Sequence, residues 1–177
     1  MLRTGVLLVR ALGIDPSTKT GVVVLDGQNV AYAGLLELNT VDGFQRSLLL
    51  KAALKRTIEE FKPDVAAIEG YAFGNKFSLA TMVEIGTLFR ERLYEDGVPW
   101  TVIAPTQLKK FVLGKGPGSK SEVRLGAYKL WGFEHASDDV VDAYVLAKMA
   151  TLYQSPGSCT QIQREVLGAI KKPSVCK

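Results

Sequence analysis

The chain has 177 residues, of which 47% are hydrophobic and 23% are charged, and its formal net charge is +4. This composition predicts one soluble globular domain with a core, and the positive charge mildly favours a polyanionic partner. Two cysteines without metal-site spacing and a single histidine exclude a zinc site, and no apolar run is long enough for a signal peptide or a membrane span. We therefore expect a cytoplasmic protein.

The first part of the chain is predicted to form three strands, a helix and a fourth strand. The strands are expected at residues 8–14, 20–25, 30–38 and 64–69, and the helix at 44–61. The pair Asp26-Gly27 is typical of a hairpin, so the first three strands form an antiparallel meander. Pro63 ends the helix, and together with Gly70 it bounds an apolar strand of the kind that is covered on both faces.

The second part is predicted to be mainly helical. Helices are expected at residues 77–95, 105–112, 119–130 and 138–153, and a fifth strand at 100–103. Ser119 and Glu122 form a capping-box pattern. The order of elements predicts an α/β fold, a mixed sheet with helices on both faces. We expect one domain over residues 1–154, and a C-terminal tail over residues 155–177 with a short helix near 162–170.

Acidic residues follow two of the predicted strands and recur on the last long helix. Asp15 ends the first strand and Glu69 ends the fourth. If those strands are neighbours, both carboxylates emerge at the same edge of the sheet, where α/β proteins usually place their sites. Asp139 and Asp142 are three residues apart and so share one helix face. We expect the four carboxylates to converge.

Converging carboxylates repel one another, and each pair at ~4 Å costs about 4 kcal/mol at an effective dielectric constant of ~20. Two divalent cations about 3.5 to 4 Å apart would relieve this repulsion and could activate water on a phosphodiester. Oxygen ligands favour Mg²⁺, with Mn²⁺ as a substitute. Taken singly, each residue has a simpler interpretation: Asp15 as a turn residue, Glu69 as a strand end, Asp138 as the helix N-cap and Asp139 as a complement to the helix dipole.

The ordered motifs resemble those of RuvC-type Holliday-junction resolvases. Gly13-Ile14-Asp15-Pro16-Ser17 resembles the first motif of that family, Ala67-Ile68-Glu69 the second and Asp139-Val140-Val141-Asp142-Ala143 the last. The stretch containing Lys120-Ser121-Glu122-Val123 resembles the family's lysine helix. The resemblance covers residues 11–150 and is closest in style to compact phage members. One departure is Ser17, where the family usually has glycine.

The resemblance implies an RNase H-like fold and a homodimer that nicks opposed strands of a branched DNA. It implies Asp15, Glu69, Asp139 and Asp142 as ligands of two Mg²⁺ ions per site, and Lys120 as a catalytic residue near the scissile phosphate. It also implies action in the cytoplasm, that of the host if the gene is phage-encoded. Compact members of the family are thought to accept other branched DNAs, so strict selectivity for four-way junctions does not follow.

Basic and aromatic residues near the acidic motifs are candidate DNA contacts. They are Lys109, Lys110, Lys115, Lys120, Arg124, Tyr71, Phe73 and Lys76. Lysines among glycines can approach and neutralise phosphates, although the same loop could simply be solvated. Tyr71 and Phe73 could wedge into opened base pairs or could cap the core. The helix over residues 77–93 is apolar over more than one stripe, which indicates a dimer interface or a helix enclosed in its own core.

Three alternatives remain open from the sequence. The same fold could cut an RNA–DNA hybrid, or it could bind junctions without cutting them. A strand that ends Gly-Ile-Asp and precedes a Thr-Gly turn also occurs in actin-like ATPases, although this chain is too short for two such domains and has no clear adenosine motif.

Overall fold

The computed structural model describes residues 9–38, 43–71 and 76–174, except for the side chains of 76–78. The described strands are β1 (Arg10–Asp15), β2 (Lys19–Asp26), β3 (Asn29–Glu37), β4 (Val65–Glu69) and β5 (Trp100–Ile103). They form one sheet in the order β3-β2-β1-β4-β5. The pairs β1–β2 and β2–β3 are antiparallel, whereas β4 is parallel to both β1 and β5. The predicted mixed sheet is therefore confirmed.

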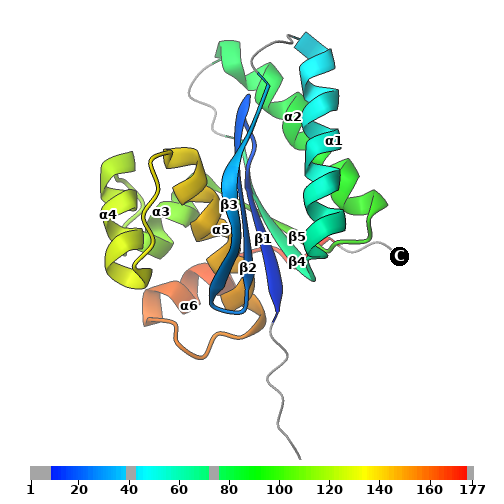
Figure 1. Cartoon of the computed structure of the whole chain (residues 1–177). Coiled ribbons are helices and arrows are strands. Elements are labelled where there is room, and N and C mark those ends of the chain that lie inside the picture. The colour runs from blue at the N-terminus through cyan, green and yellow to red at the C-terminus, as the bar shows by residue number, and fades with distance from the viewer. Residues whose placement is uncertain (1–8, 39–42, 72–75, 175–177) are drawn as a thin grey trace, which may run out of the picture.

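Helices cover both faces of this sheet (Figure 1). They are α1 (Gly43–Phe61), α2 (Lys76–Glu95), α3 (Pro105–Leu113), α4 (Lys120–Trp131), α5 (Asp138–Gln154) and α6 (Gln161–Gly168). Helices α1 and α2 lie on one face, and α5 lies on the other with α3, α4 and α6 around it (Figure 1). No helix in the described ranges has the length and apolar character that a membrane crossing requires.

The alternation of side chains along β1 explains why the sheet is covered twice. Leu12 and Ile14 are buried with Leu54 of α1 and Phe89 of α2, while Ala11 is buried with residues of α5 on the opposite face. Successive strand residues point to opposite faces, so an apolar run supplies two cores. Helix α5 can lie directly on β1 because Gly13 has no side chain: a Cβ atom there would fall 1.9 Å from the carbonyl oxygen of Ala143.

The C-terminal helix α6 packs onto α3. Val166 and Leu167 are buried in the same cluster as Leu108 of α3. The Gln163 side chain donates a hydrogen bond from Nε2 to the Phe111 carbonyl oxygen at 3.4 Å. These contacts attach the tail to the helix layer, and the domain boundary at residue 154 stays a prediction.

Candidate active site

Asp15 and Glu69 end two neighbouring parallel strands. The register pairs Ile14 of β1 with Ile68 of β4, so the residues that follow, Asp15 and Glu69, come at the same edge of the sheet. The strands end there because Pro16 and Gly70 follow. Asp15 is only 6% exposed. This arrangement is the one expected for the carboxyl ends of parallel strands.

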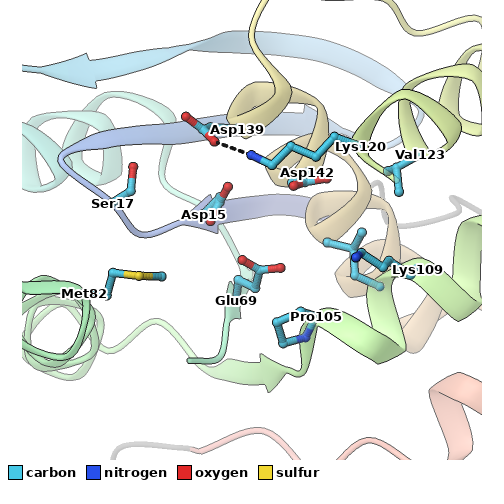
Figure 2. Close-up of a pocket in the computed structure, with 11 residues that line it drawn as sticks. Asp15, Ser17, Glu69, Met82, Pro105, Lys109, Lys120, Val123, Asp139 and Asp142 are labelled. Carbon is cyan, nitrogen blue, oxygen red and sulfur yellow. Dashed lines mark hydrogen bonds and ion pairs between the residues drawn. The ribbon is translucent and has the colours of Figure 1, made fainter. Parts of the chain in front are cut away.

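Helix α5 brings two further carboxylates to this edge. Asp139 lies in its first turn and Asp142 three residues later, so both side chains share a face. They line the same pocket as Asp15 and Glu69, and the four carboxylates come from three separate elements (Figure 2). The structure thus brings together the acidic set that the sequence singles out.

The pocket has a volume of about 310 Å³, and several of its lining residues are not among the site residues predicted from the sequence. These are Ser17 in the β1–β2 turn, Met82 of α2, Pro105 and Leu108 of α3, and Val123 of α4. Leu108 and Val123 occupy buried positions of amphipathic helices, so their pattern indicates core packing alone. Nothing in the sequence around Met82 predicts that it lines the pocket, because only the tertiary arrangement brings α2 there (Figure 2).

The carboxylates are poorly compensated in the metal-free chain. Burial raises the pKa of Asp15 well above its usual range, and the nearby charges of Glu69 and Asp142 raise it further. Burial and then Glu69 raise the pKa of Asp142 to about 7. Burial also raises the pKa of Glu69, against the opposing effects of a hydrogen bond with Asp15 and the charge of Lys120. Perturbed carboxyl groups in a pocket are typical of functional sites.

Lys120 is the basic residue that contacts this acidic set. Its Nζ atom lies 3.5 Å from Oδ1 of Asp139 (Figure 2). Burial acts to lower the pKa of Lys120, but the charges of Asp139, Asp142 and Asp15 outweigh it and raise that pKa. The ammonium group therefore stays charged beside the carboxylates.

The chemistry of these donors fits a hard divalent cation, because carboxylate oxygens are preferred ligands of Mg²⁺ and Mn²⁺. As they stand, no three histidine, cysteine, aspartate or glutamate side chains within the described ranges are close enough together to hold a metal ion. Burial first, and the charges of the neighbouring carboxylates second, disfavour ionisation and raise the pKa values of Asp15 and Asp142. A divalent cation would remove the repulsion between these charges and let the carboxylates draw together.

The start of α5 differs from the sequence prediction. Asp138 is the first residue of the helix, and the N-cap is Ser137, so the prediction of Asp138 as the N-cap is wrong. Asp138 instead forms an ion pair with Arg124 of α4, with Nη2 2.5 Å from Oδ1. Tertiary pairing with α4 outweighs the local preference of aspartate for the cap position.

The predicted basic DNA contacts are spread over α3, α4 and the loop between them. Lys109 and Lys120 line the pocket. Lys110 lies 4.0 Å from Glu165 of α6, and Lys115 lies 3.1 Å from Glu122. Exposed ion pairs of this kind are weak, so phosphates can replace the acidic partners. Contact of these lysines with DNA stays a prediction.

The predicted wedge residues follow β4. The Tyr71 ring packs against Gly86 of α2, and the Arg90 guanidinium lies 5.1 Å from the ring centroid and donates a hydrogen bond to the Tyr71 hydroxyl. This contact favours a packing role for Tyr71. Phe73 and the side chain of Lys76 lie outside the described part of the chain.

Comparison with known proteins identifies close resemblances. The family described as crossover junction endodeoxyribonuclease RuvC matches residues 11–149. A protein of that name from Chloroflexus aggregans is 32% identical over 148 residues, which covers 78% of this chain and 90% of the relative. Another from Ruegeria pomeroyi is 32% identical over 167 residues, which covers 89% of this chain and 99% of the relative.

Solved structures agree on the fold. The T. thermophilus RuvC in complex with Holliday junction substrate superimposes with a TM-score of 0.73 at 20% identity, covering 94% of this chain and 99% of that one. The Fowlpox virus resolvase bound to Holliday junction DNA gives a TM-score of 0.50 at 12% identity, covering 78% of this chain and 95% of that one. At these identities the likeness establishes the fold alone, and the predicted RNase H-like fold is confirmed.

Proposed function

Because this chain belongs to the RuvC family of crossover junction endodeoxyribonucleases, we propose that it is a metal-dependent endonuclease that cuts Holliday junctions and other branched DNA. The observation that supports this most directly is the pocket in which carboxylates from β1, β4 and α5 meet Lys120. Membership of this family argues against the alternative that the chain is a fragment of an actin-like ATPase. We expect the enzyme to act in the cytoplasm, that of the host if the gene is phage-encoded.

Asp15, Glu69, Asp139 and Asp142 would hold two Mg²⁺ ions in each site, with Asp15 and Asp142 sharing one of them and Mn²⁺ able to substitute. When bound, the ions activate the attacking water and stabilise charge on the leaving oxygen. Each carboxyl group must be ionised to serve as a ligand. Proton loss from Asp15 and Asp142, whose pKa values are raised, therefore accompanies loading of the site.

Lys120 and Lys109 would bind the scissile phosphate group. Lys120 pairs with Asp139 in the metal-free chain. The Lys120 ammonium, which lies at the pocket, would offset negative charge on the phosphate. The apolar side chains of Met82, Leu108 and Val123 line the same pocket and limit the access of bulk water to it.

Nicking opposed strands of a junction requires two sites, and we propose that a homodimer through α2 provides them. The α2 side chains of Ile85, Phe89 and Leu93 are buried in the chain's own core. Val83 and Tyr94 remain 37% and 57% exposed. Exposed apolar residues on a helix that also has a core face support this interface. Light scattering on the parent and on Val83→Glu, which we expect to shift toward monomer, tests it.

Asp15→Asn tests the catalytic assignment. The variant is expected to bind a four-way junction like the parent in the presence of EDTA, because it changes one buried group. We expect its Mg²⁺-dependent cleavage to be lost, because a neutral amide oxygen is a much weaker ligand of Mg²⁺ than a carboxylate. Asp26→Asn is the matched control, since Asp26 pairs with Arg10 at the opposite end of the β1–β2 pair. Cleavage by Asp15→Asn at the parental rate would end the assignment.

A substrate panel separates the remaining alternatives. It comprises a four-way junction, a fork, a flap, a linear duplex and an RNA–DNA hybrid, each with Mg²⁺ or with EDTA. We expect the branched DNAs to be cut only with Mg²⁺. Preferential cutting of the hybrid would instead favour the hybrid nuclease, and binding without cutting would favour an idle junction-binding protein.

A further inference from the structure

Two basic residues one turn apart on α4 face two consecutive acidic residues at the start of α5. The Nζ atom of Lys120 lies 3.5 Å from Oδ1 of Asp139, and Nη2 of Arg124 lies 2.5 Å from Oδ1 of Asp138. Residues four apart on a helix share a face, so the two ion pairs lie side by side between the helices. Lys120 and Asp139 line the catalytic pocket, whereas Arg124 and Asp138 line a neighbouring pocket.

Arg124 also binds the loop that leads into α5. Its Nη2 atom donates a second hydrogen bond to the Ala136 carbonyl oxygen at 3.0 Å. Within the described residues, the Ser137 side chain makes no capping hydrogen bond to the first turn of α5. A helix start without a side-chain cap is less well fixed. Arg124 therefore adds a contact from α4 to a helix start whose Val140 and Val141 side chains are already buried in the core.

We propose that Arg124 is a positioning residue that fixes the start of α5 against α4. By binding Asp138 and the Ala136 carbonyl oxygen, it sets where Asp139 and Asp142 lie relative to Lys120. The inference rests on the proposed function, because Asp139 and Asp142 are its metal ligands. It assigns Arg124 a role inside the fold in place of the DNA contact that the sequence predicts.

The direction of the two Arg124 hydrogen bonds matters more for positioning α5 than the positive charge of Arg124. Val123 and Ala127 anchor α4 in the core with 2% and 0% exposure, so α4 is a fixed support. The Arg124 and Asp138 side chains are 40% and 36% exposed, and a pair so exposed adds little to global stability. A planar guanidinium can hold two acceptors in fixed directions, whereas a lysine ammonium is a flexible point charge. Arg124→Lys therefore keeps the charge and loses the positioning.

The test compares Arg124→Gln, Asp138→Asn, the double variant and Arg124→Lys with the parent. Lys129→Gln is the control, because Lys129 is an exposed cation on the same helix. Three quantities are measured for each protein: single-turnover cleavage of a four-way junction, the Mn²⁺ concentration that half-maximally raises the melting temperature, and junction affinity in EDTA. Melting temperatures in EDTA establish that each variant is folded.

We expect each single variant to lose about tenfold in cleavage rate and in Mn²⁺ affinity, the usual effect of losing a group that orients metal ligands. The double variant should be no worse than Arg124→Gln, because Arg124→Gln already removes the contact that Asp138→Asn breaks. Arg124→Lys should resemble Arg124→Gln, and Lys129→Gln should resemble the parent. Junction affinity in EDTA should be unchanged throughout.

A different pattern would overturn the inference. If Arg124→Gln weakens junction binding in EDTA while Asp138→Asn cuts normally, Arg124 is a DNA contact. If both variants bind Mn²⁺ like the parent, the pair does not position the ligands. If the parent itself does not cut any branched DNA, the proposed nuclease function fails, and the Mn²⁺ comparison still decides the role of Arg124. Asp138→Asn carries the test alone should Arg124→Gln fail to fold.

Discussion

Gly21 on β2 lies against the backbone of Asp139 on α5. A Cβ atom at Gly21 would fall 2.0 Å from the carbonyl oxygen of Asp139 and 2.9 Å from the amide nitrogen of Val140. Real Cβ atoms do not approach backbone atoms so closely, so the first turn of α5 can rest on β2 only where glycine stands. This contact fixes how deeply Asp139 sits in the pocket.

Gly21→Ala is therefore expected to displace the start of α5 and to reduce cleavage strongly. Overpacking of this kind typically destabilises a protein by about 1–3 kcal/mol, which urea unfolding would measure. Gly34→Ala on β3 is the control, because its Cβ atom would meet only the tip of the Tyr32 side chain, at 2.8 Å from the hydroxyl oxygen. Equal effects of the two substitutions would show that contact with Asp139 has no special role.

The raised pKa of Asp142 predicts a pH-dependent stability of the metal-free protein. The folded chain holds a proton on Asp142 up to about pH 7, whereas the unfolded chain releases it near its ordinary value of 3.8. Its stabilising contribution is therefore present below that ordinary value and is lost as pH rises through about 7. Since one pKa unit corresponds to about 1.4 kcal/mol, the loss is of the order of a few kcal/mol.

Asp142→Asn removes this titration and tests the prediction. In EDTA, the variant should melt at a higher temperature than the parent at pH 8, and the difference should shrink at pH 5. Mg²⁺ should raise the melting temperature of the parent at pH 8 and leave that of the variant nearly unchanged. A difference between the two proteins that is the same at both pH values would contradict the assignment of the raised pKa to Asp142.

Lys120→Gln is expected to shift the pH dependence of whatever cleavage remains. The Lys120 charge lowers the pKa values of Asp142 and Glu69, so its removal raises them. Because the carboxylates must be ionised to bind metal, the acidic limb of the pH–rate profile should move to higher pH. Lys110→Gln, which alters a lysine paired with Glu165, should leave the limb in place. An unshifted profile for Lys120→Gln would separate Lys120 from the acidic set.

Leu167→Ala tests how firmly the tail is joined to the nuclease domain. Leu167 is 5% exposed on α6, and truncation of a buried leucine typically costs about 2–5 kcal/mol. We expect one cooperative urea transition with a lower midpoint. Ile162→Ala on the same helix should have a smaller effect, because Ile162 is 37% exposed. An unchanged midpoint for Leu167→Ala would mean that the tail unfolds independently.

The acidic edge could be predicted from the sequence because its signals are local. Asp15 and Glu69 are each the last residue of an apolar strand, and Pro16 and Gly70 follow them. The helix α1 lies between the two strands in the chain, which allows the strands to pair in parallel. Asp139 and Asp142 share a face by helical spacing alone. Each step needs only a few neighbouring residues, so a single sequence suffices.

The pairing between α4 and α5 could not be predicted in the same way. Ser137 and Asp138 are adjacent and both are good N-caps, and the choice between them depends on where Arg124 lies in space. The contact of Tyr71 with Arg90 likewise depends on how α2 crosses the end of β4. A pattern of neighbouring residues does not predict how two elements that are distant in the sequence pack against each other.

The order of the site along the chain has a consequence for protein synthesis. Asp15 and Glu69 lie on β1 and β4, but Asp139 and Asp142 belong to α5, which a ribosome produces only after all five strands of the sheet. A nascent polypeptide that lacks α5 has half of the acidic set and an uncovered face of the sheet, so it cannot assemble the pocket. The pocket can therefore form only after α5 has been synthesised.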